Sequence, residues 1–225
     1  MTLFNAGVSQ VFLKNVSDNK SFFEVNKLII KTLRRLLMLS IFPFTIIALV
    51  GEDFFSVAFG GNWNQAGKFI EILSLWGFSA FLVQPISQLI YVYEKQKEAL
   101  IISLGRLISR LGTLCYCLIL EKDIISTLIY FSCVGFISNI IFLRWLLKIT
   151  KCSLKSIFQD FIKYLIISIS FSLPLIASIY ILNIPSFQIL IISIGLIVFY
   201  VTYIISTDVG LKKILVQSIR RGKKS

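Results

Sequence analysis

The sequence predicts an all-α, polytopic membrane helix bundle with about six transmembrane helices. Composition is the first reason: 56% of the residues are hydrophobic, 15% are charged, and the mean hydropathy is +0.85. A water-soluble domain needs more polar surface to cover its core. Unbroken apolar runs are the second reason, because barrel strands would alternate apolar and polar residues. We therefore expect a single membrane domain over residues 1–225.

The apolar runs place the helices, since a bilayer core needs about 20 apolar residues in helical form. The expected spans are residues 36–50, 69–93, 99–120, 124–143, 162–183 and 187–207, followed by a basic cytoplasmic tail over 208–225. The first, second and fifth spans contain Pro43, Pro85 and Pro174. Proline removes a helical hydrogen bond, so we expect kinks at these positions. Residues 51–67 are expected to form an outer loop.

Positive charges alternate along the chain and predict its orientation. The segments before span one, after span two, after span four and after span six hold 6, 2, 5 and 6 Lys or Arg residues, and the intervening segments hold 1, 1 and 0. The positive-inside rule then places both termini in the cytoplasm. The net charge of +12 is read as a topology signal with attraction to anionic membrane lipids. No nucleic-acid partner is expected, because the basic residues are split among four short segments.

Arg106 and Arg110 are the most informative residues, because they fall inside the third span. An arginine near the bilayer midplane is costly unless it faces protein or water. Their spacing of four residues puts both on one helix face, together with the polar Ser103 and Thr113. This face predicts the wall of a water-filled cavity that selects anions, since guanidinium groups match phosphate oxygens. The structural alternative is that Arg106 snorkels while Arg110 pairs with a carboxylate on a neighbouring helix.

A second polar stripe accompanies Pro85 in span two, formed by Gln84, Ser87, Gln88 and Tyr91. The amide side chains of Gln84 and Gln88 are candidates for hydrogen bonds to sugar hydroxyl groups. The competing interpretation is that such polar residues hold membrane helices together. Both interpretations remain open at the level of sequence.

Several kinds of chemistry are not expected. The chain has no histidine, which excludes His-based acid–base catalysis and imidazole zinc sites. The four cysteines contain no C-x-x-C pair and are read as buried small hydrophobes: Cys115, Cys117, Cys133 and Cys152. Glu71 is the one carboxylate that enters a span, so no buried site for a coupling ion is expected. We expect no enzyme activity, no metal and no cofactor.

Three segments carry a resemblance to a known family. They are FGGNWNQAGKFIEILSLW at residues 59–76, PISQLIYVYEKQK at 85–97 and QVFLKNVS at 10–17. Together they resemble the C-terminal half of polysaccharide flippases, in the superfamily that joins multidrug and toxin extrusion (MATE) carriers with lipid-linked oligosaccharide exporters. Members have about 12 to 14 helices in two lobes, as carriers built from repeats do. The resemblance implies a partial MATE-like lobe, with a missing N-terminal half or a partner chain to complete it.

The resemblance also implies a function. It is the movement of an undecaprenyl-pyrophosphate-linked oligosaccharide across the bacterial inner membrane, for O-antigen, lipopolysaccharide or capsule biosynthesis. Its mechanism would be alternating access, with a cationic cavity for the pyrophosphate and the sugars.

Two other classes compete with this interpretation. One is a non-transporting membrane scaffold or subunit of a glycan-assembly complex, since six spans can fold and bind a partner without forming a transport path. The other is a membrane polymerase or acyltransferase. The lack of histidine, and of an acidic cluster in a sizeable outer loop, argues against that enzyme.

Overall fold

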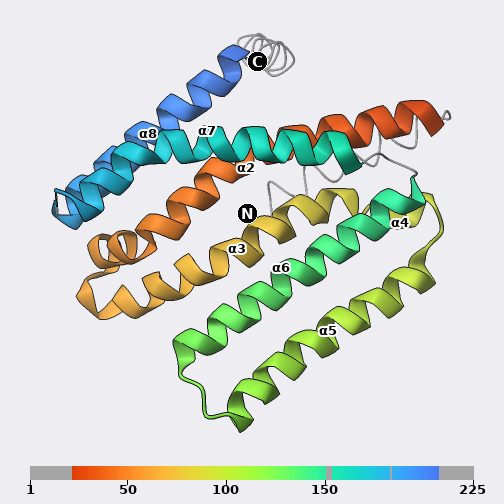
Figure 1. The fold of residues 1–225 in the computed structure, drawn as a ribbon, viewed down its shortest axis with the longest axis horizontal. Helices are drawn as coiled ribbons and strands as arrows, with labels where there is room; N and C mark the ends of the chain where they lie inside the picture. Colours follow the sequence, from red (N-terminus) through yellow and green to blue (C-terminus); the bar gives the residue numbers. More distant parts are fainter. Residues whose placement is uncertain (1–21, 151–153, 183, 208–225) are drawn as a thin grey trace, which may run out of the picture.

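The computed structural model describes residues 22–150, 154–182 and 184–207, and these residues form helices and no strand (Figure 1). Six helices in this part of the chain are long and apolar enough to cross a membrane. The predicted all-α membrane bundle is therefore confirmed. Residues 10–17, Cys152 and the expected basic tail lie outside the described residues.

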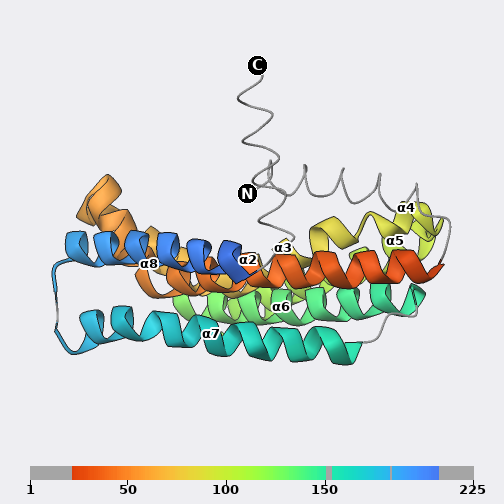
Figure 2. The ribbon, with the colours of Figure 1, turned by 90° about the horizontal axis from the view of Figure 1, so that it is seen from above.

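The long helices run up and down in alternation, as Figure 1 shows. In chain order the elements are α2 (Phe22–Phe59), the 3₁₀ helix η1 (Gly61–Trp63), α3 (Asn64–Ile86), α4 (Leu89–Val92), α5 (Gln96–Ile119), α6 (Ile124–Ile149), α7 (Leu154–Tyr180) and α8 (Ser186–Thr207). Helix α2 packs against α3, α7 and α8, and α3 packs against α6. Helix α5 packs on α6 and lies at one edge of the bundle, with α8 at the opposite edge (Figure 1). Figure 2 shows α7 and α8 on opposite sides of α2.

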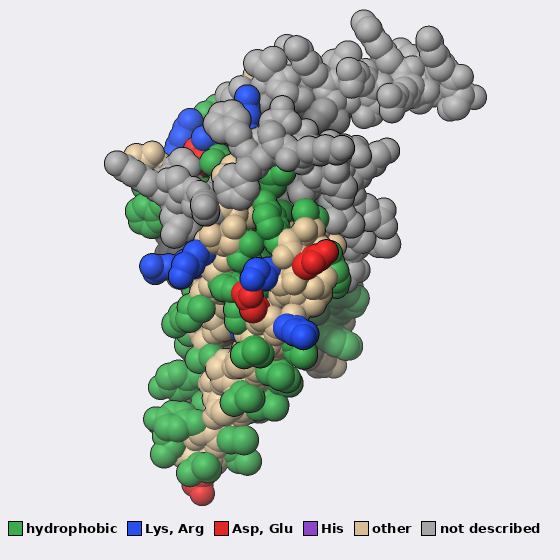
Figure 3. Space-filling model, turned by 90° about the vertical axis from the view of Figure 1, so that its right-hand side faces the viewer, with side chains coloured by type: hydrophobic (Ala, Val, Ile, Leu, Met, Phe, Trp, Pro, Cys, Tyr) green, Lys and Arg blue, Asp and Glu red, His purple; other side chains and the backbone are tan. Residues whose placement is uncertain are grey.

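Charge separates the two ends of this bundle. We call the end where α2, α5 and α7 begin the basic end; among described residues it carries Lys27, Lys31, Arg34, Arg35, Lys95, Lys97, Arg144 and Lys148. Figure 3 looks onto this end, where Lys and Arg side chains gather. We call the opposite end the acidic end; it carries Glu52, Asp53, Glu71, Glu121 and Asp123.

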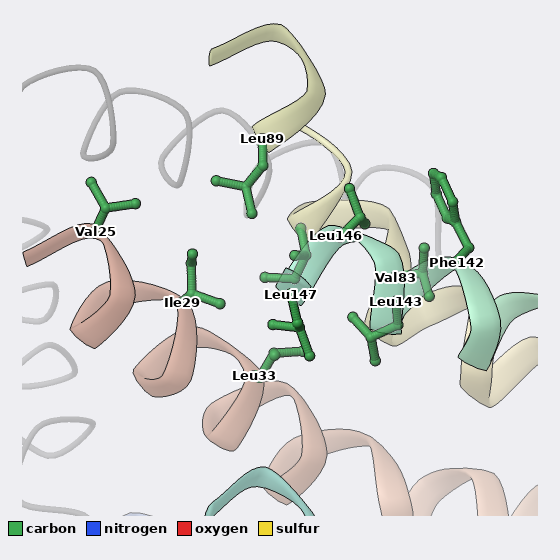
Figure 4. Packing of buried hydrophobic residues seen from close by; sticks show 10 residues of the cluster. Val25, Ile29, Leu33, Val83, Leu89, Phe142, Leu143, Leu146 and Leu147 are labelled. Carbon is green, nitrogen blue, oxygen red and sulfur yellow. The ribbon is translucent and has the colours of Figure 1, made fainter. Parts of the chain in front are cut away.

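Helix α2 is much longer than the expected span 36–50 and runs through Pro43 without ending there. Its first turns are amphipathic: Val25, Ile29 and Leu33 recur every four residues and are buried. Figure 4 shows these three side chains directed toward residues of α3 and α6, among them Leu146. Charged residues between them lower the hydropathy without breaking the helix, which is why the apolar run alone underestimates its length.

The expected outer loop over residues 51–67 is wrong. Helix α2 continues to Phe59 and α3 begins at Asn64, so four residues separate the two helices. Gly51 and Gly67 explain their close approach, because a Cβ atom on Gly67 would lie 2.4 Å from Cα of Glu52 and 2.6 Å from the Gly51 carbonyl oxygen. Only glycine permits this contact.

The remaining spans differ from the expected ones at their ends. The expected span 69–93 is divided, because α3 ends at Ile86, one residue after Pro85, and the short α4 follows from Leu89 to Val92. Helix α6 runs on to Ile149 rather than 143, and α7 begins at Leu154 rather than 162. These extensions include basic residues that a search for apolar runs leaves out. Helices α5 and α8 agree with the expected spans to within three residues.

Three apolar clusters hold the bundle together, and α2 contributes to all of them. The first joins α2, α3 and α6 at the basic end (Figure 4). The second joins α2 to α7 and α8, where Phe42 stacks on Tyr200 at 4.4 Å and the Tyr200 hydroxyl donates a 2.7 Å hydrogen bond to the Met38 carbonyl. The third lies between α2 and α3 and is rich in phenylalanine. Helix α5 has no buried residue in any of the three.

Candidate functional site

Helix α5 is attached to the bundle along one narrow face. Only 6% of the residues in its apolar stretch are buried inside the protein. Ala99 near its first turn and Cys117 in its last turn are the two buried residues. They fix the rotation of the helix, so Arg106 and Arg110, which lie between them on the same face, are half-buried against the bundle. The grouping of these two arginines on the packed face follows the sequence prediction.

Arg106 begins a hydrogen-bonded chain that crosses three helices. Its Nη2 donates to Oδ1 of Asn139 on α6, a side chain with no exposed surface. The Asn139 amide in turn donates to the Ser79 hydroxyl on α3 at 2.9 Å, and Ser79 donates to the Trp76 carbonyl at 2.8 Å. The Arg106 guanidinium also lies over the ring of Phe142, with 4.6 Å between Cζ and the ring centroid. This chain is the polar link between α5, α6 and α3.

Arg110 lies over an aromatic ring instead. Its Cζ is 5.0 Å from the ring centroid of Trp76. Gly135 on α6 provides the room for that indole, because a Cβ atom at this position would lie 2.7 Å from Cδ1 of Trp76. Phe131 contacts the same indole edge-on, at 5.7 Å between centroids. The position of Arg110 therefore depends on the missing side chain of Gly135 on the neighbouring helix α6, which leaves room for the indole of Trp76 from α3.

The cluster has more donors than acceptors. The Nε atoms of Arg106 and Arg110 and the Nε1 atom of Trp76 are buried and have no hydrogen-bond partner within the described chain. The ion pairs among described residues lie elsewhere: Arg34–Asp160, Lys68–Glu52 and Lys95–Glu98. A carboxylate partner for Arg110, the structural alternative from the sequence, is not found in the described chain. Buried donors and cations without partners are unfavourable, so the cluster is suited to accept an anion.

Depth makes this charge unusual. Arg106 and Arg110 follow Gln96, the first residue of α5, by ten and fourteen residues, which is about 15 and 21 Å along the helix at 1.5 Å per residue. Both guanidinium groups thus belong to the middle of a 24-residue helix. Snorkelling carries an arginine head only to a nearby interface, so these groups stay at membrane depth.

The other sequence candidates lie at the edge of this cluster or away from it. Thr113 is half-buried and its hydroxyl donates to the Ser109 carbonyl at 2.8 Å, while Ser103 is exposed. Gln84 is exposed and Gln88 is half-buried; they lie five and nine residues beyond Ser79, where α3 gives way to α4. The polar residues near Pro85 therefore lie further along α3 and α4 than Trp76 and Ser79, and they are separated from the arginine pair.

The expectation of buried cysteines is wrong in part, because Cys115 and Cys133 are exposed on the outer surface of the bundle and only Cys117 is buried. No group of His, Cys, Asp and Glu that could hold a metal occurs within the described ranges.

Sequence reasoning missed the residues that receive the arginines, namely Trp76, Ser79, Asn139 and Phe142. One signal was available: Asn139 is the one amide side chain within the apolar run of span four. An asparagine at membrane depth needs a hydrogen-bond partner on another helix. Nothing in the sequence identifies that partner as Arg106, since the pairing depends on how α5 is rotated against α6.

The chain was compared with known proteins at three levels. No family model, no curated protein and no solved structure matches it. The resemblance to polysaccharide flippases therefore rests on the sequence segments alone, and the function is argued from the site.

Proposed function

We propose that this chain is part of a membrane transporter that moves a lipid-linked oligosaccharide with a pyrophosphate group across the bacterial inner membrane. The observation that carries the proposal is the pair Arg106 and Arg110, held at membrane depth without a carboxylate partner among the described residues. The resemblance of residues 59–76 and 85–97 to flippases supports it independently.

Phosphate chemistry fits the pair better than other anions do. Each guanidinium is a rigid fork of N–H donors that matches two phosphate oxygens at once. Two cations one helical turn apart suit a group with two phosphates and at least two negative charges. In a low-dielectric interior such an anion offsets the cost of both buried charges, whereas a neutral sugar would leave them uncompensated.

Position favours transport over static binding. A pyrophosphate held between the two membrane surfaces is partway through a crossing. Helix α5 makes its main contacts with α6 and reaches the three apolar clusters only through the half-buried Ile102, so its separation would leave the buried members of these clusters in contact. Movement of α5 against α6 would open the arginine face to one surface and then to the other, as alternating access requires. The positive-inside rule places the basic end in the cytoplasm.

A second candidate function is supported by the same contacts. The hydrogen bond from Arg106 to Asn139 and the two cation–π contacts attach α5 to the bundle. Cation–π contacts stabilise a structure by about 0.5–2 kcal/mol each, so these two contacts and the hydrogen bond can hold α5 against α6 and α3. On this view the arginines are structural and the chain is a non-transporting scaffold within a glycan-assembly complex.

Substitution of Arg110 separates the two functions. The full chain, reconstituted in vesicles with a fluorescent undecaprenyl-pyrophosphate-linked sugar, is assayed by accessibility of the sugar to a membrane-impermeant reagent. Arg110→Gln should abolish translocation while lowering the melting temperature by only a few degrees, because Arg110 contributes one cation–π contact. Arg110→Lys should retain part of the activity, since it keeps the charge but loses the fork.

The matched control is Lys122→Gln, which removes the same charge at the exposed turn between α5 and α6. It should translocate at the rate of the unmodified chain. Full activity of Arg110→Gln would contradict the transport proposal. Large loss of thermal stability in Arg110→Gln would favour the scaffold.

A further inference from the structure

An apolar groove runs along a different face of α6 from the one that contacts the arginine pair. It lies between α6 and α7, and residues of α2 and α3 form its floor. Its wider part has a volume of about 590 Å³, and a second part of about 260 Å³ continues it toward the acidic end. Phe78, Phe136 and Phe161 line both parts, so the two cavities adjoin at these three rings, and we treat them together as one groove.

The groove is long and narrow. Along α2 its lining extends from Leu37 to Ala48, eleven residues or about 16 Å at 1.5 Å per residue. Its walls are almost entirely hydrocarbon and aromatic, and Phe158 at its rim is 63% exposed. The shape and lining suit an extended hydrocarbon chain rather than a compact polar molecule.

The side chain of Arg144 supplies a positive charge at the basic end of the groove. Arg144 lines the wider part, is exposed, and forms no ion pair or hydrogen bond within the described residues. Lys148 follows one turn later on α6 and is also exposed. The acid on the facing helix is already engaged, because Asp160, between Phe158 and Phe161, accepts from Nε of Arg34 at 2.8 Å. The mouth of the groove therefore offers positive charge to an anion.

We infer that this groove binds one acyl chain of an anionic phospholipid, with the lipid phosphate on Arg144 and Lys148. The inference goes beyond the proposed transport function and does not rest on it. Two features select this occupant. The rim residues Phe158 and Ile140 are exposed, so a bilayer lipid can reach the groove, and Arg144 lies five residues before the end of α6, where basic residues attract anionic headgroups.

The groove and the arginine pair are separate sites. On α6, Asn139 and Phe142 face α5, whereas Ile140, Leu143 and Arg144 line the groove. One residue step rotates an α-helix by about 100°, so Ile140 and Arg144 lie roughly 100° and 140° around α6 from Asn139, while Leu143 lies at the boundary between the two faces. The helix itself stands between the phospholipid and the cluster around Arg106.

The test measures lipid preference directly in the groove. Phe158→Trp introduces a tryptophan at the rim, and the purified full chain is placed in bilayers that contain brominated phosphatidylglycerol or brominated phosphatidylcholine at equal mole fraction. Because the chain already contains three tryptophans, the fluorescence quenching measured without Phe158→Trp is subtracted from that measured with it. Phosphatidylglycerol should quench the added tryptophan at least about fivefold more effectively at low mole fraction, since each of the two basic residues near the surface contributes a factor of about five.

Three variants make the result specific. Arg144→Gln should remove most of the preference, whereas Lys97→Gln, an exposed charge at the same end outside the groove, should leave it unchanged. Ile140→Phe fills the groove from a position that is 40% exposed without adding a fluorophore, and should weaken quenching by both lipids without changing the core. Melting temperatures of all variants check that each is folded.

Several results would overturn the inference. One is equal quenching by the two lipids in the unmodified groove, and another is an equal loss of preference in Arg144→Gln and Lys97→Gln, which would indicate diffuse attraction to the basic end. Displacement of phosphatidylglycerol by undecaprenyl phosphate at equimolar concentration would assign the groove to the polyprenyl chain of a transported lipid instead. Retained preference in a folded Arg144→Gln variant would remove the role of Arg144.

Discussion

Asn139 is the residue that decides how Arg106 is held, because its carbonyl accepts from Arg106 and its amide donates to Ser79. An asparagine satisfies the hydrogen bond of the arginine but leaves its charge uncompensated. A carboxylate at the same position would supply both. Neutral hydrogen bonding beside a buried cation is the arrangement expected of a site that keeps its charge for a ligand.

This difference gives a prediction for two substitutions. Asn139→Asp should keep or raise the melting temperature, since it places a carboxylate on Arg106, and should strongly reduce binding of a pyrophosphate lipid. Asn139→Leu should destabilise the chain by about 1–3 kcal/mol, because it leaves buried donors without partners. Thermal unfolding and lipid binding measured on the same preparations check both. Undiminished binding by Asn139→Asp would mean that the anion does not need a free charge on Arg106.

Gly135 offers a second prediction at this scale. Gly135→Ala puts a Cβ atom 2.7 Å from the Trp76 ring, so the indole under Arg110 must move, at a cost of about 1–3 kcal/mol. Gly105→Ala on α5 is the matched control, because nothing lies within 4 Å of that position and alanine favours a helix by up to about 1 kcal/mol. Melting temperatures should therefore fall for the first and rise for the second. Equal shifts in both would contradict the packing of Trp76 on α6.

At the scale of single helices, the sequence predicts which elements exist better than where they end. The six apolar runs correspond to six long helices. The observed helix ends differ from the expected ones where a helix is amphipathic rather than apolar throughout, as in the first turns of α2 around Lys27 and Lys31. A search for apolar runs finds segments suited to lipid, and it misses helical turns that carry charged residues. The expected loop at 51–67 failed for another reason: the Gly51–Gly67 contact is a property of two helices and has no signature in either one.

The candidate site likewise has features that the sequence predicts and features that depend on packing between helices. Helical periodicity predicts that Arg106 and Arg110 share a face, and they do. The same reasoning places Ser103 with them, but this residue is exposed. The register of α5 is set by the burial of Ala99 and Cys117 against α6. That register, and with it the contacts to Trp76 and Asn139, depends on packing between helices that are distant in sequence.

The start of α6 carries a pH-dependent prediction. Asp123 caps this helix by accepting from the Ser126 backbone N–H at 3.1 Å. Hydrogen bonds from the Ser126 hydroxyl and backbone lower the pKa of Asp123 below its usual value. A carboxyl whose pKa is lowered in the folded state stabilises the fold above its unfolded pKa, and this contribution is lost as the pH falls through the folded value.

The protection factor of the amides in the first turn of α6, which corrects for the pH dependence of intrinsic hydrogen exchange, should therefore decrease on acidification below the ordinary aspartate pKa of about 3.9. In Asp123→Asn, which keeps a capping acceptor without a titrating group, this decrease should be absent. An identical pH dependence in both chains would show that another group controls the end of the helix.

At the scale of the whole molecule, the two ends of the bundle differ in charge, and this difference predicts the orientation. Reporter fusions near Asn62 and Glu121, at the acidic end, should lie outside, and a fusion near Lys97, at the basic end, should lie inside. The structure puts the connection between α2 and α3, which contains Asn62, at the same end of the bundle as the turn between α5 and α6, which contains Glu121 (Figure 1). A reporter that places them on opposite sides of the membrane would contradict both the fold and the orientation.

The molecule as a whole consists of a firmly packed body and one loosely attached helix. Helices α2, α3, α6, α7 and α8 share the three apolar clusters, whereas α5 is fastened through the arginine cluster. The proposed ligand and the fastening of α5 therefore depend on the same residues, so an anion that takes the guanidinium groups would also loosen the helix. This coupling is what the transport proposal requires.

Binding of an anion by Arg106 and Arg110 is tested most directly through the fluorescence of Trp76, because the Arg110 guanidinium lies over its ring. In a chain with Trp63→Phe and Trp145→Phe, Trp76 is the one remaining tryptophan, and its emission is followed during titration with farnesyl diphosphate or with farnesol. If the arginine pair binds the diphosphate, Trp76 emission should change saturably with farnesyl diphosphate and should not change with farnesol. In Arg110→Gln, farnesyl diphosphate should cause no change. An equal response to the alcohol, or a full response in Arg110→Gln, would contradict binding by the arginine pair.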